Sequence, residues 1–185
     1  GKSTHMAALM QNQGTIVSWD IHPHRVKLIE ENASRLKASI VKTRVKDAKI
    51  LDETMMGSFD RVLIDAPCSG LGVIRRKPDI KWSKKPDDIK ALRNEQEHII
   101  FVCSKYVKPG GVLVYSTCSI EPKENEELVE DFLAKNQEFA YDDLRKSLPE
   151  MLHDELKSPY GYITLYPHIH GTDGFFVARL KRLKT

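Results

Sequence analysis

The chain has 185 residues, of which 41% are apolar and 30% are charged, and its formal net charge is +3 at pH 7. This length and composition are typical of one globular domain that buries its own core. No apolar run reaches the about 18 residues of a membrane-spanning helix, and no signal peptide is recognisable. Three cysteines in a chain of this size argue against a disulfide framework. We therefore expect a soluble cytoplasmic protein without a membrane partner.

Apolar spacing and turn residues predict helices that alternate with strands along most of the chain. In chain order, the predicted elements are a helix over 3–12, a strand over 15–20, a helix over 22–38, strands over 39–47 and 59–66, a loop over 67–86, a helix over 86–107, a strand over 111–118, a helix over 122–136, and strands over 161–167 and 174–182. Residues 138–158 show no pattern that indicates a chemical role.

This alternation predicts an α/β fold with a mostly parallel, doubly wound sheet. The run over 59–66 is almost continuously apolar, which is typical of a strand buried on both faces. Only the short link HIHGTD separates the last two strands, so we expect them to pair antiparallel.

Acids and thiols follow the predicted strands at one edge of this sheet. Asp20, Asp47 and Asp65 each stand at the end of a strand, and Cys68 and Cys118 follow two of the buried strands. Ligands of open α/β sheets bind at the carboxyl ends of the strands. The sequence therefore predicts that these five side chains face one crevice.

Asp20 and Asp47 are candidates for contacts with a nucleoside. An acid at the position of Asp20 can accept hydrogen bonds from a ribose diol, and Asp47 is placed to meet an adenine amino group or ring edge. Either residue could instead cap a helix or close a turn.

The two strand-end cysteines suit addition chemistry on a pyrimidine. A thiolate that adds to C6 of cytosine makes C5 nucleophilic toward a methyl donor, after which the C5 proton and the thiolate must leave. This needs a nucleophile, an acid near N3 and N4, and a base, and Cys118, Asp65 and Cys68 supply those three types. Cysteines are also common as small buried apolar residues, which is our interpretation of Cys103.

A metal site is not expected. The sequence has no CxxC pair, which also argues against a thiol redox enzyme, and no histidine stands near either thiol. His168 and His170 form an HxH on a connection, but no fitting third ligand is evident.

Two basic clusters are candidates for contact with a phosphate backbone. The segment RRKPDIKWSKK over 75–85 holds six basic residues and one acid, and the C-terminal ARLKRLK is the second cluster. Either could instead be a solvated loop or tail. Trp82 either supports a nucleic acid strand or anchors the loop to the body of the protein. The candidate residues in the loop are Arg75, Arg76, Lys77, Lys81, Trp82, Lys84 and Lys85.

Five segments together resemble the RNA cytosine-5 methyltransferases of the RsmB/Sun (Fmu) type. DAPCSGLGVIRRKPDIKW and LVYSTCSIEPKENE are similar to the two signature segments of that family, and HGTDGFFVARLKR to its closing strand. GKSTHMAALM resembles the helix after the glycine-rich cofactor loop, and DIHPHRVKLIEEN the ribose-binding segment. The resemblance covers essentially the whole chain.

The resemblance implies a Rossmann-like S-adenosylmethionine-dependent methyltransferase fold whose last strand is antiparallel, and a 16S ribosomal RNA substrate. Cys118 would attack C6, and Cys68 would help to release the product by assisting either loss of the C5 proton or expulsion of the thiolate. Asp65 would contact the cytosine beside the cofactor. The carbonyl of Pro67 would hold the exocyclic amine. The cofactor-binding residues would be Gly1, Lys2, Asp20, Arg25, Asp47 and Asp65. S-adenosylhomocysteine would be the second product, and no metal would be needed.

The chain departs from the family at its start, since the first strand, most of the glycine-rich loop and the N-terminal RNA-binding part are missing. Residues 1–185 would then be an N-terminally truncated catalytic domain. We expect a gap between the strands that end at Asp20 and Asp65, which either close up or receive another segment. We also expect this chain to bind the cofactor poorly.

Other functions fit parts of the same pattern. A DNA cytosine-5 methyltransferase would use the thiol of the Pro-Cys segment, Cys68, as its nucleophile, whereas the TCS cysteine indicates the RNA class. A transfer RNA enzyme or an RNA-binding module without transfer activity is a further alternative.

Overall fold

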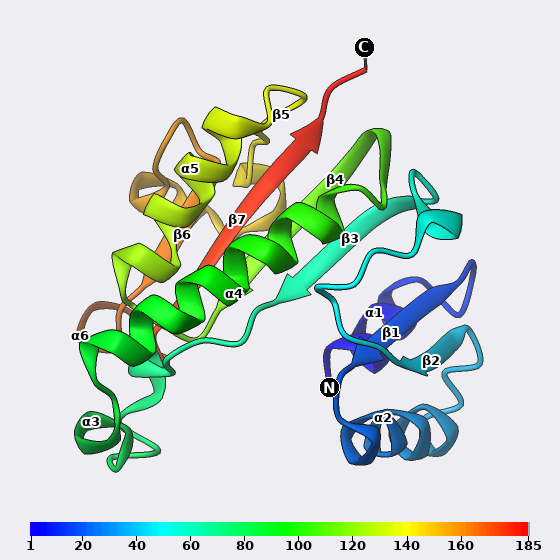
Figure 1. Ribbon diagram of the computed structural model, residues 1–185, viewed down its shortest axis with the longest axis horizontal. Helices are drawn as coiled ribbons and strands as arrows, with labels where there is room; N and C mark the ends of the chain where they lie inside the picture. The colour runs from blue at the N-terminus through cyan, green and yellow to red at the C-terminus, as the bar shows by residue number, and fades with distance from the viewer. Residues whose placement is uncertain (185) are drawn as a thin grey trace. The chain divides into compact units, whose positions relative to one another are not determined.

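The computed structural model describes residues 1–184, and Figure 1 shows its helices and strands. The chain divides into two compact units, Gly1–Leu51 and a second that begins at Asp52. Their strands form separate sheets, because no ladder joins β1 (Ile16–Asp20) to β3 (Phe59–Asp65) within the described residues. The expectation of a gap between the strands that end at Asp20 and Asp65 stays a prediction.

The first unit combines two parallel strands with two helices. Its elements are α1 (Lys2–Leu9), β1 (Ile16–Asp20), α2 (Pro23–Arg35) and β2 (Val41–Val45). β1 and β2 pair in parallel along their whole length. A small core of Ala7, Ile16, Ala33 and Ala38 joins the helices to the strands. On α2, Val26 is buried but Leu28 is 53% exposed, so the buried face is narrower than the apolar spacing predicts.

The first helix ends earlier than predicted. The predicted helix over 3–12 stops at Leu9, because Gln11 and Asn12 adopt left-handed backbone angles, with φ of 52° and 55°. The side-chain amide of Asn12 then donates to the carbonyl of Lys37 at 3.0 Å, which ties this turn to the residues that follow α2.

The second unit contains a five-stranded sheet. The strands are β3 (Phe59–Asp65), β4 (Val107–Thr117), β5 (Phe139–Tyr141), β6 (Tyr162–Leu165) and β7 (Phe175–Arg182). Their order is β3-β4-β7-β5, and β6 also pairs with β7. β3 and β4 are parallel, whereas β7 is antiparallel to β4, β5 and β6. This confirms the mostly parallel pattern with an antiparallel last strand, including the predicted pairing of the last two strands.

Helices and turns cover both faces of this sheet. The helices are α3 (Ile80–Ser83), α4 (Pro86–Ser104), α5 (Glu126–Lys135) and α6 (Pro167–His170). The 3-10 turns are Glu53–Met55, Leu71–Val73, Pro122–Glu124, Arg145–Ser147 and Glu150–Glu155. α4 and α5 lie side by side in front of the sheet (Figure 1). Residues 142–165 pack on the strands through Leu144, Leu156 and Ile163. Within the described residues, no helix has the length and apolar character to cross a membrane.

The centre of the sheet is its most buried part. Leu113 and Tyr115 of β4 and Phe176, Ala178 and Leu180 of β7 are all fully buried. The expectation that the strand over 59–66 is buried on both faces is wrong, since Leu63 is 38% exposed. The reason is that β3 stands at the end of its sheet, with β4 as its one neighbour among the described strands.

Two predicted boundaries also need correction. The segment KPGG was expected to separate a helix from a strand over 111–118, but it lies inside β4, which starts at Val107 and pairs there with Phe59 across a register shift. The helix predicted over 122–136 is broken at Asn125, whose backbone angles (φ −116°, ψ −109°) separate the turn Pro122–Glu124 from α5. This break turns the last residue of the turn, Glu124, into the protein interior.

Candidate active site

The two strand-end cysteines of the second unit meet at the carboxyl ends of β3 and β4. Asp65 is the last residue of β3 and is opposite Ser116 of β4. The Sγ atoms of Cys68 and Cys118 are 3.2 Å apart, and both cysteines are half-buried and unbridged. Three of the predicted catalytic side chains therefore stand at one edge, with Asp65 exposed there.

The neighbouring sulfur shifts the pKa of the Cys68 thiol. The hydrogen bond to Cys118, burial, and the charge of Cys118 raise the pKa of the Cys68 thiol well above its ordinary value. Cys68 therefore keeps its proton at neutral pH and can donate it as a hydrogen bond to the sulfur of Cys118. A thiol hydrogen bond of this kind favours the thiolate form of its acceptor.

Glycines bring three loops together behind the cysteines. The amide of Gly72 donates to the carbonyl of Cys118 at 3.0 Å, and the amide of Gly174 donates to the carbonyl of Gly72 at 2.7 Å. A Cβ atom on Gly174 would lie 2.6 Å from both Gly72 Cα and Ile120 Cγ2, closer than any side chain tolerates. The segment before β7 thus packs on both cysteine loops, a contact that the sequence motif alone did not predict.

A buried carboxylate connects the cysteine loops from the inside. Glu124 is fully buried and accepts hydrogen bonds from Ser69, Ser119 and Gln96. Tyr115 donates its hydroxyl to the Glu124 carbonyl at 2.8 Å, and burial followed by the charge of Glu124 raises the pKa of Tyr115. Sequence reasoning missed all five residues. A Glu six positions after the TCS cysteine was the available signal, but it was interpreted as a helix residue.

The carbonyl of Pro67 already has one partner. Gln96 of α4 donates its Nε2 to this carbonyl at 2.8 Å and to Glu124 at 3.0 Å. The Oε1 atom of Gln96 is buried without a hydrogen-bond partner in the described part of the chain, so the two donated bonds fix the amide. A carbonyl oxygen has two lone pairs, which leaves one for the exocyclic amine that Pro67 was predicted to hold.

In the first unit, Asp20 and Asp47 lie at the carboxyl ends of β1 and β2. Asp20 accepts from the amide of His22 at 2.8 Å, and Arg25 lies 3.7 Å from its second oxygen. Asp47 likewise accepts from the amide of Lys49 at 2.9 Å. Both acids therefore close turns, as the alternative interpretation held. The second oxygen of each lies beside a cation, Arg25 or Lys49, and still has lone pairs that can accept from a ribose or an adenine.

The remaining cofactor candidates stand at the start of α1. Gly1 is the residue before the first helical residue, Lys2, and both are exposed. An N-terminal helix end that carries a cation suits a carboxylate or another anion. The carboxylate acceptors of Asp20 and Asp47 and the cation of Lys2 together suit a nucleoside that carries an amino acid chain.

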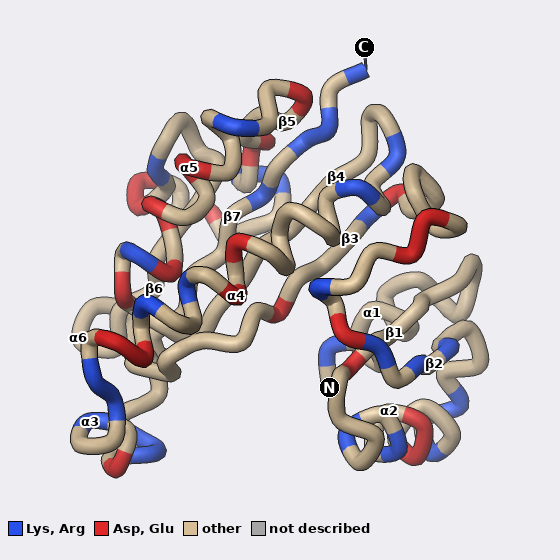
Figure 2. The backbone as a smooth tube through the Cα atoms, viewed as in Figure 1, with Lys and Arg blue, Asp and Glu red and all other residues tan. Residues whose placement is uncertain are grey.

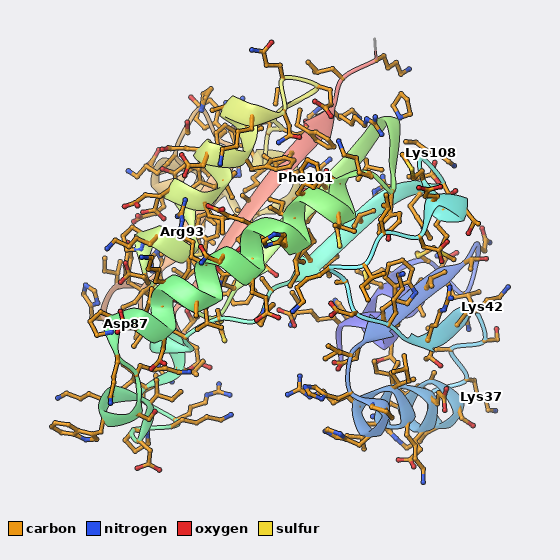
Figure 3. All side chains as sticks on the ribbon, viewed as in Figure 1. Lys37, Lys42, Asp87, Arg93, Phe101 and Lys108 are labelled. Carbon is orange, nitrogen blue, oxygen red and sulfur yellow. The ribbon has the colours of Figure 1, made fainter. Side chains whose placement is uncertain are left out.

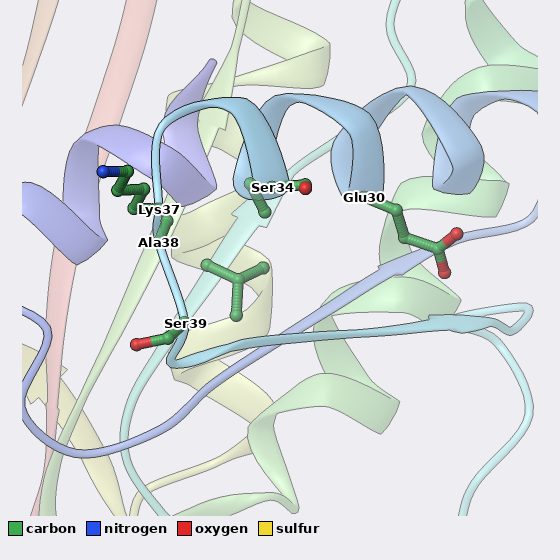
Figure 4. A pocket seen from close by; sticks show the side chains of 7 residues that line it. Glu30, Ser34, Lys37, Ala38 and Ser39 are labelled. Carbon is green, nitrogen blue, oxygen red and sulfur yellow. The ribbon is translucent and has the colours of Figure 1, made fainter.

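A pocket of about 400 Å³ in the first unit lies elsewhere. It is bounded by α2 and the start of β2, with Glu30, Ser34, Lys37 and Ser39 on its rim (Figure 4). This is the amino end of β2, opposite to the end that carries Asp20 and Asp47. Since ligands of such sheets bind at the carboxyl ends, we do not assign the cofactor to it.

Among residues 1–184, no three His, Cys, Asp or Glu side chains are grouped to hold a metal.

The basic loop over 75–85 gathers its cations around α3 (Figure 2). Trp82 is 81% exposed, with the Lys81 ammonium 5.1 Å from its ring centroid. The alternative in which Trp82 anchors the loop to the body of the protein is therefore wrong. Lys77 and Lys85 are exposed, and Lys84 is half-buried.

The two arginines of this loop have intramolecular partners. Arg75 and Arg76 both pair with Asp173, at 3.4 and 2.9 Å, and Arg75 also donates to the carbonyls of Gly171 and Thr172. Their contact with RNA stays a prediction, but they also tie the loop to the segment before β7.

The C-terminal cluster is used inside the protein. Arg179 of β7 pairs with Asp142 at 2.7 Å. Arg182 donates to the carbonyl of Val107 at 2.6 Å and lies over the ring of Phe139. These contacts join β7 to its neighbours, which favours the structural interpretation of this tail.

Comparisons with known proteins agree with this architecture. A family model described as 16S rRNA methyltransferase RsmB/F matches residues 1–181. A probable ribosomal RNA small subunit methyltransferase B from Bacillus subtilis (strain 168) is 45% identical over 98% of this chain and 41% of its own length. A ribosomal RNA small subunit methyltransferase F from Serratia proteamaculans (strain 568) is 36% identical over 98% of this chain and 38% of its own.

A solved structure extends the comparison to three dimensions. NSun6 from Pyrococcus horikoshii, solved with SFG, is 33% identical, with a TM-score of 0.85 over 100% of this chain and 46% of that one. The chain thus spans less than half the length of these three relatives. The predicted S-adenosylmethionine-dependent methyltransferase fold is confirmed.

Proposed function

Because the chain belongs to the RsmB/F family of 16S ribosomal RNA methyltransferases, we propose that the full-length protein methylates C5 of a cytosine in ribosomal RNA. The methyl donor is S-adenosylmethionine, of which SFG, present in the archaeal structure, is an analogue. The observation that most directly supports C5 chemistry is the pair of thiols 3.2 Å apart beside an exposed aspartate. Addition of a thiolate to C6 is the step that makes C5 of cytosine reactive.

The residues of the cysteine edge take separate roles in this reaction. Cys118 forms a bond from its Sγ to C6. Asp65 acts as the acid at the N3 and N4 edge of the ring, where a proton shared with N3 offsets the negative charge that the addition places on the base. The cofactor supplies a methyl group on a sulfonium, which C5 takes. A water molecule then takes the C5 proton, which restores the C5–C6 double bond and expels Cys118 as a thiolate, with 5-methylcytosine and S-adenosylhomocysteine as products.

Cys68 acts at the release step. Its thiol keeps a proton and lies 3.2 Å from the sulfur that must leave. A hydrogen bond from Cys68 stabilises the departing Cys118 thiolate, which lowers the barrier to breaking the Sγ–C6 bond. A protonated thiol does not take the C5 proton, so we assign Cys68 to thiolate expulsion and not to proton abstraction.

Cofactor and RNA contacts complete the proposal. Asp20 holds the ribose, Asp47 the adenine, and Gly1, Lys2 and Arg25 flank them, all in the first unit. The cytosine must leave its helix or come from a single-stranded region, because stacking hides C5 and C6. The exposed Trp82 offers a stacking surface for a flanking base, with Lys77, Lys81, Lys84 and Lys85 for the phosphates.

The test is to trap the covalent intermediate. Full-length protein with Cys68→Ala is incubated with unmodified ribosomal RNA and S-adenosylmethionine and separated on a denaturing gel. We expect a slowly migrating RNA–protein band, because methyl transfer proceeds while release is blocked. The band should disappear when Cys118→Ala is added to the same protein.

The opposite pattern would reassign the nucleophile. If Cys118→Ala alone still methylates RNA and no band forms with Cys68→Ala, the thiol that attacks C6 is Cys68. That result would favour the mechanism of the DNA class. RNA binding without methyl transfer by the unaltered protein would instead favour the binding module.

A further inference from the structure

We propose that Glu124 is a positioning residue that sets the distance between Cys68 and Cys118. This inference deepens the proposed function and rests on it for its catalytic meaning. The carboxylate of Glu124 reaches the two cysteines indirectly. It acts through Ser69 and Ser119, each of which directly follows one of the two cysteines.

One carboxylate connects the two cysteine loops. Glu124 Oε1 accepts from the amide of Ser69 at 2.8 Å, and Oε2 accepts from the hydroxyls of Ser69 and Ser119, both at 2.5 Å. With the 3.0 Å bond from Gln96, four donors meet the about four acceptor positions of a carboxylate. Because each serine is covalently bound to its cysteine, a shift of either loop would break a bond to Glu124.

The burial of the Glu124 carboxylate indicates a role that an apolar side chain could not fill. Glu124, Ser119 and Gln96 are fully buried and Ser69 nearly so, and the four donors to the carboxylate are all neutral. A buried carboxylate is unfavourable unless it is fully hydrogen-bonded, and apolar side chains would join two loops at a lower cost. Apolar packing does not fix the orientation of the two loops, whereas hydrogen bonds from both loops to one carboxylate do.

Glu124 is itself held from two sides. The hydroxyl of Tyr115 in β4 donates to the Glu124 carbonyl at 2.8 Å. On the other side Arg93, which points from α4 toward α5 in Figure 3, donates to the carbonyl of Lys123 and pairs with Asp131 of α5 at 2.5 Å. The carboxylate is therefore anchored to the central strand and to both helices of the covering layer.

The network also reaches the base-binding carbonyl. Gln96 donates to Glu124 and to the carbonyl of Pro67 with the same nitrogen. The residue before Cys68, the residue after it and the residue after Cys118 are thus all positioned by one buried group. A displacement of about 1 Å at a reacting atom is enough to cost about 100-fold in rate.

The test measures the thiol separation directly. Phenylarsine oxide condenses with two neighbouring thiols, forming two As–S bonds and releasing one water, and it binds a single thiol far more weakly. The full-length protein carries Cys103→Ala, so that Cys68 and Cys118 are the thiols that this chain offers. We compare the Kd for phenylarsine oxide in this protein, in Glu124→Gln, and in Glu126→Gln, a matched change two residues away and outside the network.

We expect one tight equivalent in the parent protein, which either Cys68→Ala or Cys118→Ala abolishes. Glu124→Gln should weaken it about tenfold or more, because the effective concentration of one thiol near the other falls, while Glu126→Gln leaves it unchanged. In the methyl transfer assay, Glu124→Gln should lower kcat by about 100-fold with KM for RNA unchanged.

Several results would overturn the positioning role. The role is rejected if Glu124→Gln folds and binds phenylarsine oxide with the Kd of the parent protein, even if its kcat falls. It is also rejected if the parent protein does not bind phenylarsine oxide through both thiols. If Glu124→Gln does not fold, Ser119→Ala takes its place in the test. We expect this variant to bind phenylarsine oxide several-fold more weakly than the parent protein, and an unchanged Kd would contradict the positioning role. Absence of methyl transfer in the parent protein would reject the proposed function, while the arsenical measurement would still decide the positioning.

Discussion

The cysteine edge and the basic loop are parts of the same unit with opposite construction. At the cysteine edge, Ser69, Ser119 and Glu124 are buried and hydrogen-bonded to one another. In the basic loop, Trp82 is 81% exposed and stands on a helix of only four residues. Covalent chemistry requires fixed distances between reacting atoms, whereas contact with a phosphate backbone requires charge that can follow its partner.

Ion pairs and hydrogen bonds hold the junction between the cysteine edge and the basic loop. Arg75 and Arg76 open the basic loop, yet they hold Asp173 and the carbonyls before β7. The same segment before β7 supplies Gly174, which packs on the cysteine loops. The loop is thus fixed where it leaves the cysteine edge and exposed beyond it. This difference predicts that changes at the edge affect catalysis and stability, and that changes in the loop affect RNA affinity.

The largest effect is expected at the nucleophile. Cys118→Ala should lower methyl transfer from labelled S-adenosylmethionine by at least about 1,000-fold, because the proposal assigns the bond to C6 to this thiol alone. RNA affinity, measured by filter binding, should stay within about twofold, since the basic loop is untouched. Cys103→Ala is the matched control, because that thiol is buried on α4 away from the edge. A comparable loss in the control would show that cysteine removal acts through folding.

A second test fills the contact between the loops. Gly174→Ala places a Cβ atom 2.6 Å from Gly72 Cα and Ile120 Cγ2, so backbone must move. We expect the free energy of unfolding to fall by about 1–3 kcal/mol, as measured with urea. Thr172→Ala, an exposed change two residues away, should cost less than about 0.5 kcal/mol. Equal stability of the two variants would mean that the three loops are not packed as tightly as the distances indicate.

Charge reversal tests the other region. Lys81, Lys84 and Lys85 changed to Glu should weaken RNA binding and lower the slope of log K against log salt by about 2 or more. At saturating RNA, kcat should be unchanged, because no residue of the cysteine edge is altered. The control reverses Lys27, Lys37 and Lys42, exposed cations of the first unit. The latter two are labelled in Figure 3. If both triple variants bind equally weakly, the loop has no special part in RNA contact.

Stacking on the exposed indole is a smaller contribution. Trp82→Ala should weaken binding to single-stranded RNA by about 1–3 kcal/mol, and Trp82→Phe should restore part of it. The free energy of unfolding should change by less than about 0.5 kcal/mol, because the side chain has few contacts to lose. A large loss of stability with unchanged RNA affinity would contradict the stacking role.

The sequence predicts the fold and the site well where apolar periodicity and the ends of strands determine where a residue lies. Alternating patterns predict the α/β fold, and strand ends predict that Asp65, Cys68 and Cys118 stand at one edge, since parallel strands share their carboxyl ends. The buried network was not predictable in the same way. Glu124 looks like a first-turn helix acid, and its burial depends on Ser69 and Gln96, which are distant in sequence.

The exposed β3 and the short β5 were missed for related reasons. An apolar run predicts burial, but whether a second neighbour pairs with β3 is a tertiary fact that no window of residues contains. β5 has three residues, Phe139–Tyr141, too few for a periodic pattern, and it exists because β7 offers an edge to pair with.

The smallest expected effect is on stability and comes from a carboxylate at the surface, Asp143, in contrast to the buried carboxylate of Glu124. Hydrogen bonds from the Arg145 side chain and backbone lower the pKa of Asp143 to about 2. In the unfolded chain an aspartate titrates near about 3.9, so the folded state favours the charged form. Asp143 therefore stabilises the fold above that unfolded pKa, and this contribution is lost as pH falls from about 4 to 2.

The measurement is urea unfolding at pH 6, 4 and 2.5 for the parent protein and Asp143→Asn. The difference between the two should be small at pH 6, since the pair is exposed and screened by solvent, and it should shrink toward zero at the lowest pH. A difference that grows as the pH falls would have the wrong sign for a carboxylate with a lowered pKa. Such a result would mean that Asp143 is held by its turn with Arg145 and not by its charge.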